Sequence, residues 1–336
     1  MTIAAQQPLR CGIVLAGGEG KRVRPFIRRL LGVDLPKQYV SFIGTRSMLE
    51  HTFTRIEPLI PPERLFVVVA RDHLDHIEVQ RQINERPPHT VISQPLNRET
   101  GPGLLLPLMH LVKHFPNSIV GVFPSDHFVL QEDRFTACVR QAFEAVEKCP
   151  TQIVFLGVKA ADPEQEYGYI LPEPQDPDLG SPVQAVKAFV EKPEPRIAEQ
   201  ILSLGGLWNT MVMVFRPGIL LHLVSMSAPK LYHSFQQIFR SLGTCRESLT
   251  VEKIYRQMTP LNFSKDLLEG LDLYSRRQLA VVPMEGVSWS DWGSEERIVA
   301  VLRDLGYLDR LFKRHPSDDA CYQLPAVAEV RMTVSL

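Results

Sequence analysis

LAGGEGKRVRP, residues 15–25, follows directly on a short apolar run and decides the fold that we expect for this chain. The run before it, Ile13–Leu15, is typical of a buried strand, so the glycines fall where a strand ends and a helix begins. Three glycines within residues 17–20 let backbone N–H groups approach an anion without a Cβ in the way. The stretch therefore predicts a phosphate-binding loop, with Arg22 as a cationic donor.

Two better-known glycine-rich patterns do not match this stretch. A P-loop requires a glycine where Leu15 stands and a hydroxyl side chain where Arg22 stands. A dinucleotide-binding fingerprint requires a third glycine where Val23 stands. What remains, L-A-G-G-x-G-x-R followed by P-K-Q at residues 36–38, resembles the signature of the sugar-1-phosphate nucleotidyltransferases.

Composition and charge exclude several classes of partner. The 336 residues allow about two domains, or one large α/β domain with an appendage. A hydrophobic content of 44% and a charged content of 22% are those of an ordinary globular protein. The net charge of −1 argues against a nucleic-acid polymer or an anionic membrane as partner. The cations among the first forty residues fit a small polyanion better.

The five cysteines are widely spread and contain no C-x-x-C, so they suggest neither a disulfide framework nor a zinc knuckle. The first ten residues lack the apolar core of a signal peptide. No run approaches the roughly 18 apolar residues that a membrane span needs. We therefore expect a cytoplasmic protein with reduced thiols and no membrane partner.

From about residue 11 to 158, short β-rich runs alternate with amphipathic segments. The runs at 65–69, 118–123 and 153–158 are apolar on both faces, as strands of a parallel sheet are. Between the last two, apolar residues from 135 to 146 repeat at helical spacing. This alternation predicts an α/β fold with a doubly wound, mostly parallel sheet. Ligands of such sheets bind beyond the carboxyl ends of the strands, where the glycine loop is expected.

After residue 163 the pattern changes to a proline-rich stretch at 172–182 that is typical of a loop or hairpin tip. Strands are expected again at 185–190 and 211–215, with a helix at about 196–204 between them. We interpret this region as an insertion that covers the site and binds a second substrate. Near the end, Ser294 is a suitable N-cap for a helix that Gly306 would stop.

Two aspartates are candidates for a metal site. Asp126, in FPSDH at 123–127, follows a buried strand, and Asp291 lies in WSDWG at 289–293. Carboxylates that converge from distant parts of a chain can hold one Mg²⁺, which leaves its other positions to phosphates and water. Taken alone, each aspartate is better explained as a turn or cap residue, but beside the glycine loop the metal site becomes the favoured interpretation.

Three further motifs carry groups suited to a sugar phosphate. Glu191 and Lys192 stand side by side and would suit a hydroxyl and a phosphate, although an exposed charge pair is an equal alternative. Asn209, next to a tryptophan, offers an amide that both donates and accepts, unless the pair is structural. Gly168 would let the backbone approach a ligand closely, and a β-bulge is the alternative.

Taken in order, these pieces resemble the mannose-1-phosphate guanylyltransferase family. The matching blocks lie between about residues 11 and 305 and read LAGGEGKR, LPKQY, SQPLNRETGPG, FPSDH, YGYI, FVEKP, WN, FSKDLLE and WSDWG. The resemblance implies a nucleotide-diphospho-sugar transferase, Rossmann-like fold with an inserted sugar-binding subregion. It also implies a Mg²⁺-dependent reaction that joins mannose 1-phosphate to GTP and releases pyrophosphate.

The resemblance also implies a role for each matching residue. The residues expected to contact the nucleotide are Leu15, Ala16, Gly17, Gly18, Gln94, Pro95 and Thr100. The residues expected to bind the other groups are Arg22 and Lys37 for the triphosphate, Asp126 and Asp291 for Mg²⁺, Lys192 for the sugar phosphate, and Gly168, Glu191 and Asn209 for mannose. Arg22, Lys37, Asp126 and Asp291 are the predicted catalytic residues.

The predicted organisation is one nucleotidyltransferase domain over residues 1–310, followed by a tail at 311–336 of unknown role. Its nucleotide-binding half would span about 11–158 and its sugar-binding half about 159–293. The expected partners are GTP and mannose 1-phosphate, and the sequence leaves a homo-oligomer open.

Two alternatives to this function stay open. One is a related enzyme that joins glucose 1-phosphate to UTP or dTTP, and the other is a catalytically silent protein that senses nucleotide sugars. Three departures from the family pattern bear on these points. Extra residues at 26–35 affect the placement of Lys37. Gly101 and Gly103 in place of alanines could loosen the wall of the nucleotide site, Met211 in place of a glycine could change the sugar preference, and both changes leave room for the sensor.

Overall fold

The apolar run before the glycine loop forms strand β1, Arg10–Ala16, in the interior of a nine-stranded sheet. The computed structural model describes residues 8–174 and 182–308. The strands are β1 (Arg10–Ala16), β2 (Leu65–Ala70), β3 (Val91–Gln94), β4 (Ile119–Pro124), β5 (Phe128–Val129), β6 (Ile153–Lys159), β7 (Gly168–Pro172), β8 (Gln184–Glu191), β9 (Leu207–Phe215), β10 (Leu279–Met284) and β11 (Trp289–Ser290). The helices are α1 (Arg24–Leu31), α2 (Met48–Ile56), α3 (Ile77–Asn84), α4 (Thr100–His114), α5 (Glu132–Lys148), α6 (Pro195–Ser203), α7 (Pro217–Ser227), α8 (Pro229–Ser241), α9 (Glu247–Gln257), α10 (Leu273–Arg276) and α11 (Glu295–Asp304).

The large sheet has the strand order β3-β2-β1-β4-β9-β6-β10-β8-β7. Strands β1 to β4 pair in parallel, and β10 pairs in parallel with β6. Strand β9 runs antiparallel to β4, β6 and β7, and β8 runs antiparallel to β10 and β7. The prediction of a mostly parallel sheet is therefore confirmed, with β8 and β9 as the two reversed strands among those described. A second, two-stranded sheet joins β5 to β11.

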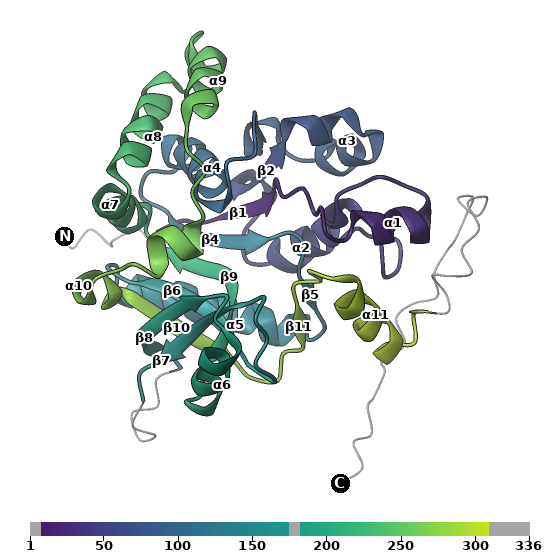
Figure 1. The fold of residues 1–336 in the computed structure, drawn as a ribbon. Coiled ribbons are helices and arrows are strands. Elements are labelled where there is room, and N and C mark those ends of the chain that lie inside the picture. The colour runs from purple at the N-terminus through teal and green to yellow at the C-terminus, as the bar shows by residue number, and fades with distance from the viewer. Residues whose placement is uncertain (1–7, 175–181, 309–336) are drawn as a thin grey trace, which may run out of the picture.

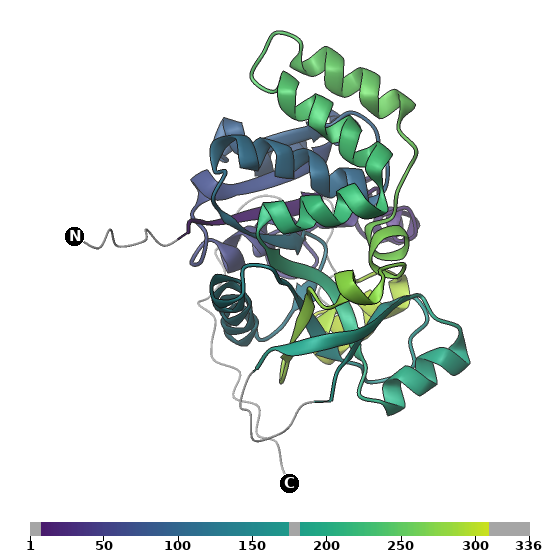
Figure 2. The same cartoon turned by 90° about the vertical axis from the view of Figure 1, so that its left-hand side faces the viewer.

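Along the central strands, alternate residues belong to two different hydrophobic cores. Val14 and Val67 belong to a buried cluster that includes side chains of α2 and α5. Their neighbours Ile13 and Phe66 belong to a second cluster, which includes side chains of α4 and α8. Because successive side chains of a strand point to opposite faces, helices cover both faces of this sheet. Figures 1 and 2 show α7, α8 and α9 gathered beside α4.

Most of the predicted elements are confirmed. The runs at 65–69, 118–123, 153–158 and 185–190 are strands β2, β4, β6 and β8, and the helical repeat at 135–146 is α5. The helix expected at 196–204 is α6, and α11 begins after Ser294, whose hydroxyl accepts a hydrogen bond from the Arg297 N–H at 3.4 Å. Gly306 follows α11 with a φ of +68°.

One strand differs from its predicted bounds. The strand expected at 211–215 begins earlier, at Leu207, although the polar residues Asn209 and Thr210 interrupt the apolar pattern. Thr210 is tolerated because its buried hydroxyl donates to the carbonyl of Leu156 at 2.7 Å. The proline-rich stretch joins β7 to β8, and its central residues 175–181 lie outside the described residues, as does the tail at 311–336.

Candidate active site

The glycine loop follows β1 and is anchored by side chains of the LPKQY segment at residues 35–39. The Gln38 amide donates to the carbonyls of Ala16 and Gly18, each at 2.8 Å, and the Tyr39 hydroxyl donates to Ala16 at 3.0 Å. The hydroxyl of Ser125 donates to the carbonyl of Leu15 at 2.7 Å. In a planar trans peptide the C=O and N–H point in opposite directions. Anchoring the carbonyls of Ala16 and Gly18 therefore turns the N–H groups of the residues that follow them away from the Gln38 amide.

Gln94, at the end of β3, lies against this loop. A Cβ built on Gly17 would lie 3.9 Å from the Gln94 amide nitrogen, and one built on Gly103 would lie 3.3 Å from its amide oxygen. Gln94 is almost completely buried, and within the described part of the chain its Oε1 accepts no hydrogen bond. Such a buried orphan acceptor is costly unless a ligand or water supplies the donor.

The segment after Gln94 leads into helix α4. Pro95 follows β3 directly, and Thr100 begins α4, where its hydroxyl oxygen accepts a hydrogen bond from the N–H of Phe263 at 2.8 Å. Gly101 packs tightly, since a Cβ there would lie 2.8 Å from the carbonyl oxygen of Leu261. The glycine at this position thus allows close packing of the wall rather than loosening it.

Lys37 joins the two predicted metal ligands. It lies in a 3-10 helix, Lys37–Tyr39, and its side chain is 9% exposed. Its Nζ lies 3.2 Å from Asp126 Oδ2, and it donates to the backbone carbonyls of Asp291 and Trp292, the latter at 3.1 Å. One ammonium group therefore contacts two segments that are far apart in the sequence.

The small sheet explains why these two segments meet. Asp126 follows β4 and precedes β5, whereas Asp291 follows β11, and the antiparallel pairing of β5 with β11 sets Phe128 opposite Ser290. The ring of Phe128 stacks on that of Trp292 with centroids 5.3 Å apart. The labels in Figure 1 place β5 beside β11, below the carboxyl end of β4.

The two carboxylates have different surroundings. Oδ1 of Asp291 accepts hydrogen bonds from the Tyr167 hydroxyl at 3.1 Å, the Gly293 N–H at 2.9 Å and Arg297 Nη1 at 3.0 Å. Burial alone would raise the pKa of Asp291, but the charges of Lys37 and Arg297 outweigh it and lower this pKa. Asp126 is more exposed, and its Oδ1 lies 3.8 Å from His127 Nε2.

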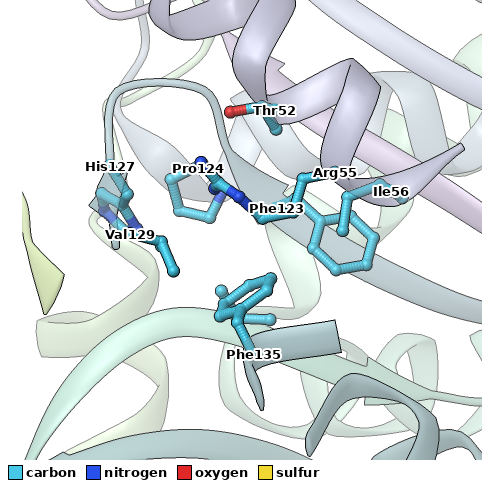
Figure 3. Close-up of a pocket in the computed structure, with 9 residues that line it drawn as sticks. Thr52, Arg55, Ile56, Phe123, Pro124, His127, Val129 and Phe135 are labelled. Carbon is cyan, nitrogen blue, oxygen red and sulfur yellow. The ribbon is translucent and has the colours of Figure 1, made fainter. Parts of the chain in front are cut away.

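His127, the residue after Asp126, lines a small cavity. Figure 3 shows its ring beside Pro124 and Val129, across from Arg55 and Thr52. The cavity measures about 10 Å³, close to the minimum for one water molecule. Burial lowers the pKa of His127 to about 4, so this imidazole is neutral at pH 7.

Arg22 and its neighbouring cations are all paired with acidic residues. The Arg22 guanidinium contacts the carboxylate of Glu166, which precedes β7, and both side chains are about half exposed. The other pairs in this region are Lys21 with Glu19, Arg24 and Arg28 with Asp34, and Arg29 with Glu295. A bound polyanion would therefore compete with carboxylates for these cations.

The residues predicted to bind the sugar gather where β7, β8 and β9 meet. Gly168 pairs with Glu191 in the sheet, and a Cβ on Gly168 would lie 2.5 Å from Glu191 Oε2 and 3.6 Å from the Asn209 Cβ. Burial raises the pKa of Glu191. Lys192 has a φ of +48°, and its N–H donates to the carbonyl of Tyr167 at 3.1 Å.

Met211 stands two residues after Asn209 in an unusual conformation. Its φ of +56° lies in the left-handed region that favours glycine, and its N–H donates to Asn209 Oδ1 at 3.0 Å. Its sulfur accepts a hydrogen bond from the Ser264 hydroxyl at 3.1 Å, in a π-helix over Phe263–Leu268. A non-glycine residue held this way costs about 1–3 kcal/mol, which the surrounding structure must offset.

Several residues around the site were missed by the sequence analysis. Gln38 and Tyr39 anchor the glycine loop, and Tyr167 and Arg297 hold Asp291. Gln38 lies within the P-K-Q motif, so its place could have been anticipated. Arg297 carries no such signal, because only the fold of α11 brings it to Asp291.

Among the helices of residues 8–174 and 182–308, none combines the length and the apolar character that crossing a bilayer requires. The same residues contain no group of three or more acidic, histidine or cysteine side chains arranged to hold a metal ion. A metal at this site would therefore rely on Asp126, Asp291 and the substrates.

A doubly wound α/β sheet with a glycine loop at the carboxyl end of its first strand defines a class of nucleotide-binding proteins. Two acidic segments and a buried lysine lie beside the loop here. The chain belongs to the nucleotidyl transferase family, which matches residues 11–306.

Curated relatives and solved structures agree with this assignment. The chain is 27% identical over 290 residues to the xanthan biosynthesis protein XanB of Xanthomonas campestris, covering 86% of this chain and 58% of that protein. It is 26% identical over 285 residues to the mannose-1-phosphate guanylyltransferase RfbM of Salmonella typhimurium, covering 84% of this chain and 56% of RfbM. The chain thus spans less than three fifths of the length of these relatives.

A crystal structure from Thermus thermophilus, described as a mannose-1-phosphate geranyltransferase, superposes with a TM-score of 0.71. Its sequence is 25% identical, and the match covers 91% of this chain and 80% of that one. The nucleotide-diphospho-sugar transferase fold is therefore confirmed.

Proposed function

We propose that this chain is a mannose-1-phosphate guanylyltransferase, which joins mannose 1-phosphate to GTP and gives GDP-mannose and pyrophosphate. The name of the Salmonella relative and the order of the nine sequence blocks support this substrate pair. The observation that carries the proposal is the Lys37 bridge between Asp126 and the main chain at Asp291, beside the glycine loop. This bridge brings an ammonium group and two acidic residues to the place where a nucleoside triphosphate would react.

The reaction sets the task of the site. An oxygen of the sugar phosphate attacks the α-phosphorus of GTP in line, and the bond from that phosphorus to the bridging oxygen of pyrophosphate breaks. Both reactants are anions that repel each other, so catalysis consists of positioning them and neutralising their charge. No covalent bond to the protein is required.

The nucleotide would lie on the loop and on Gln94. The N–H groups that follow the anchored carbonyls of Ala16 and Gly18 suit phosphate or ribose oxygens. The orphan Oε1 of Gln94 suits an N–H donor of the base. Leu15, Pro95 and Thr100 would complete this wall.

Asp126 and Asp291 fit a magnesium ion. Both are hard oxygen donors, and each retains an oxygen: Oδ1 of Asp126 and Oδ2 of Asp291 are not the atoms engaged by Lys37 and Arg297. Two carboxylate ligands are the number that Mg²⁺ commonly takes from a protein, because its remaining ligands are phosphates and water. When bound, Mg²⁺ supplies charge neutralisation for the reacting phosphates.

The cationic side chains would bind the phosphates directly. Arg22 would release Glu166 and bind the triphosphate. Lys37 would hold the two acidic segments in place and lie near the same phosphates. Lys192 would bind the phosphate of the sugar. Gly168, Glu191 and Asn209 would contact the mannose hydroxyls, and the missing Cβ of Gly168 leaves the room that the Glu191 carboxylate occupies.

A pyrophosphate-release assay tests the proposal. GTP, ATP, UTP and dTTP are each combined with mannose, glucose and N-acetylglucosamine 1-phosphates, with Mg²⁺ or with EDTA. We expect release only with GTP, mannose 1-phosphate and Mg²⁺. Release with glucose 1-phosphate and UTP or dTTP would favour the related transferase, and binding of GDP-mannose without any release would favour the sensor.

A further inference from the structure

Arg297 lies in the first turn of α11 and connects three parts of the chain. Its Nη1 donates to Asp291 Oδ1 at 3.0 Å, and its Nη2 pairs with Glu164 at 2.8 Å. The guanidinium carbon lies 4.3 Å from the centre of the Tyr167 ring. The Arg297 side chain is only 17% exposed. We call Glu164, Tyr167, Asp291 and Arg297 the Asp291 clamp.

The clamp acts on one oxygen of the carboxylate. Oδ1 of Asp291 receives three donors, from Tyr167, Arg297 and the backbone of Gly293. A Cβ on Gly293 would lie 2.5 Å from Oδ2, so the absence of that atom leaves room around the second oxygen. Three donors on one oxygen fix the rotation of the carboxylate, and Oδ2 remains for another ligand.

Lys37 and the clamp hold the same residue at different atoms. Lys37 contacts the backbone carbonyl of Asp291, whereas Arg297 and Tyr167 contact its side chain. Lys37 therefore fixes the position of the backbone at Asp291, and the clamp fixes the orientation of the Asp291 carboxylate. Outer partners of this kind commonly orient metal ligands and tune their affinity.

We propose that Arg297 and Tyr167 are positioning residues that orient Asp291 Oδ2 toward the divalent ion of the reaction. This inference rests on the proposed function, because it requires that ion. Neither residue belongs to the set that the sequence assigned to the site. Glu164 in turn holds the far side of the guanidinium and restricts its rotation.

The test measures Mn²⁺ binding by electron paramagnetic resonance, using the full chain with GTP and without a sugar phosphate, so that no turnover occurs. Arg297→Gln should weaken Mn²⁺ binding about 10- to 100-fold, the range typical of outer-shell partners. Tyr167→Phe should weaken it less, because it removes one donor and keeps the ring. Arg297→Lys should recover part of the loss, since lysine keeps the charge but lacks the forked geometry.

The matched control is Arg303→Gln. Arg303 lies in the same helix, and its side chain is exposed. This variant removes the same charge without touching the clamp, so its Mn²⁺ affinity should equal that of the wild type. In an Asp291→Asn background, Arg297→Gln should add less than a twofold change, because the carboxylate that it orients is gone.

Two results would overturn the inference while the proposed function stands. One is a folded Arg297→Gln protein that binds Mn²⁺ within twofold of the wild type, and the other is a full effect of Arg297→Gln in the Asp291→Asn background. If Arg297→Gln does not fold, Tyr167→Phe decides by the same criterion. Wild-type protein that takes up no Mn²⁺ with GTP would contradict both the inference and the proposed function.

Discussion

Replacing Lys37 with methionine tests how much the buried bridge stabilises the protein. Methionine keeps most of the aliphatic side chain and removes the ammonium. The ammonium contacts Asp126 Oδ2 at 3.2 Å and donates to the carbonyls of Asp291 and Trp292. Since the Lys37 side chain is 9% exposed and Trp292 is almost fully buried, little water can replace these donors.

The expected magnitude follows from these three contacts. Asp126 is 34% exposed, so solvent screens its attraction and the pair contributes at most about 1 kcal/mol. Leaving the two carbonyls without their charged donor costs about 1–3 kcal/mol. The free energy of unfolding should therefore fall by roughly 3 kcal/mol, and the melting temperature by roughly 6 °C or more.

Thermal unfolding followed by circular dichroism measures this difference, with Lys21→Met as the control. Lys21 has the same charge on the glycine loop, but its side chain is 77% exposed and pairs with Glu19 at the surface. Its loss should change stability by less than about 1 kcal/mol. A Lys37→Met protein that melts together with Lys21→Met would refute the reasoning.

Three further predictions concern the site and the wall around it. Asp126→Asn should slow turnover at least about a hundredfold, or roughly 2.7 kcal/mol of transition-state stabilisation, and near-normal steady-state rates would remove Asp126 from the site. Gly101→Ala should destabilise the protein by about 1–3 kcal/mol in urea unfolding, because its Cβ would lie 2.8 Å from the carbonyl of Leu261. Gly218→Ala in α7, where a Cβ meets nothing within 4 Å, should instead be neutral or stabilising, and equal effects would contradict the packing argument. Burial lowers the pKa of His73, so the unfolded chain binds the proton more tightly and stability should fall as the pH drops below about 6.5. His73→Gln should reduce this dependence of stability on pH. An unchanged dependence would mean that other titratable groups cause it.

Much of the nucleotide-binding side could be predicted from the sequence, because its signals are local. A strand that is buried on both faces appears in the sequence as a short apolar run, so β1, β2 and β4 could be predicted. The glycine loop could be predicted because its glycines directly follow such a run. Asp126 was found in the same way, since it directly follows β4. Each of these features depends on residues within about ten positions of one another.

The contacts of the site could not be predicted, because they join distant segments. No local pattern indicates that the ammonium of Lys37 would meet the backbone at Asp291, or that Glu166 would pair with Arg22. The early start of β9 depends on Thr210 finding a carbonyl on β6, which only the folded sheet supplies. The roles of the site residues and the division into two halves near residue 158 stay predictions.

The place of β9 in the sheet affects the order in which the chain can fold. Strand β9 lies between β4 and β6, although it is synthesised after both. Until residue 215 has left the ribosome, β4 and β6 each present an unpaired apolar edge, which is a template for wrong pairing. We expect a nascent chain that stops near residue 160 to aggregate or to bind chaperones, and one that extends past β10 to become protease-resistant.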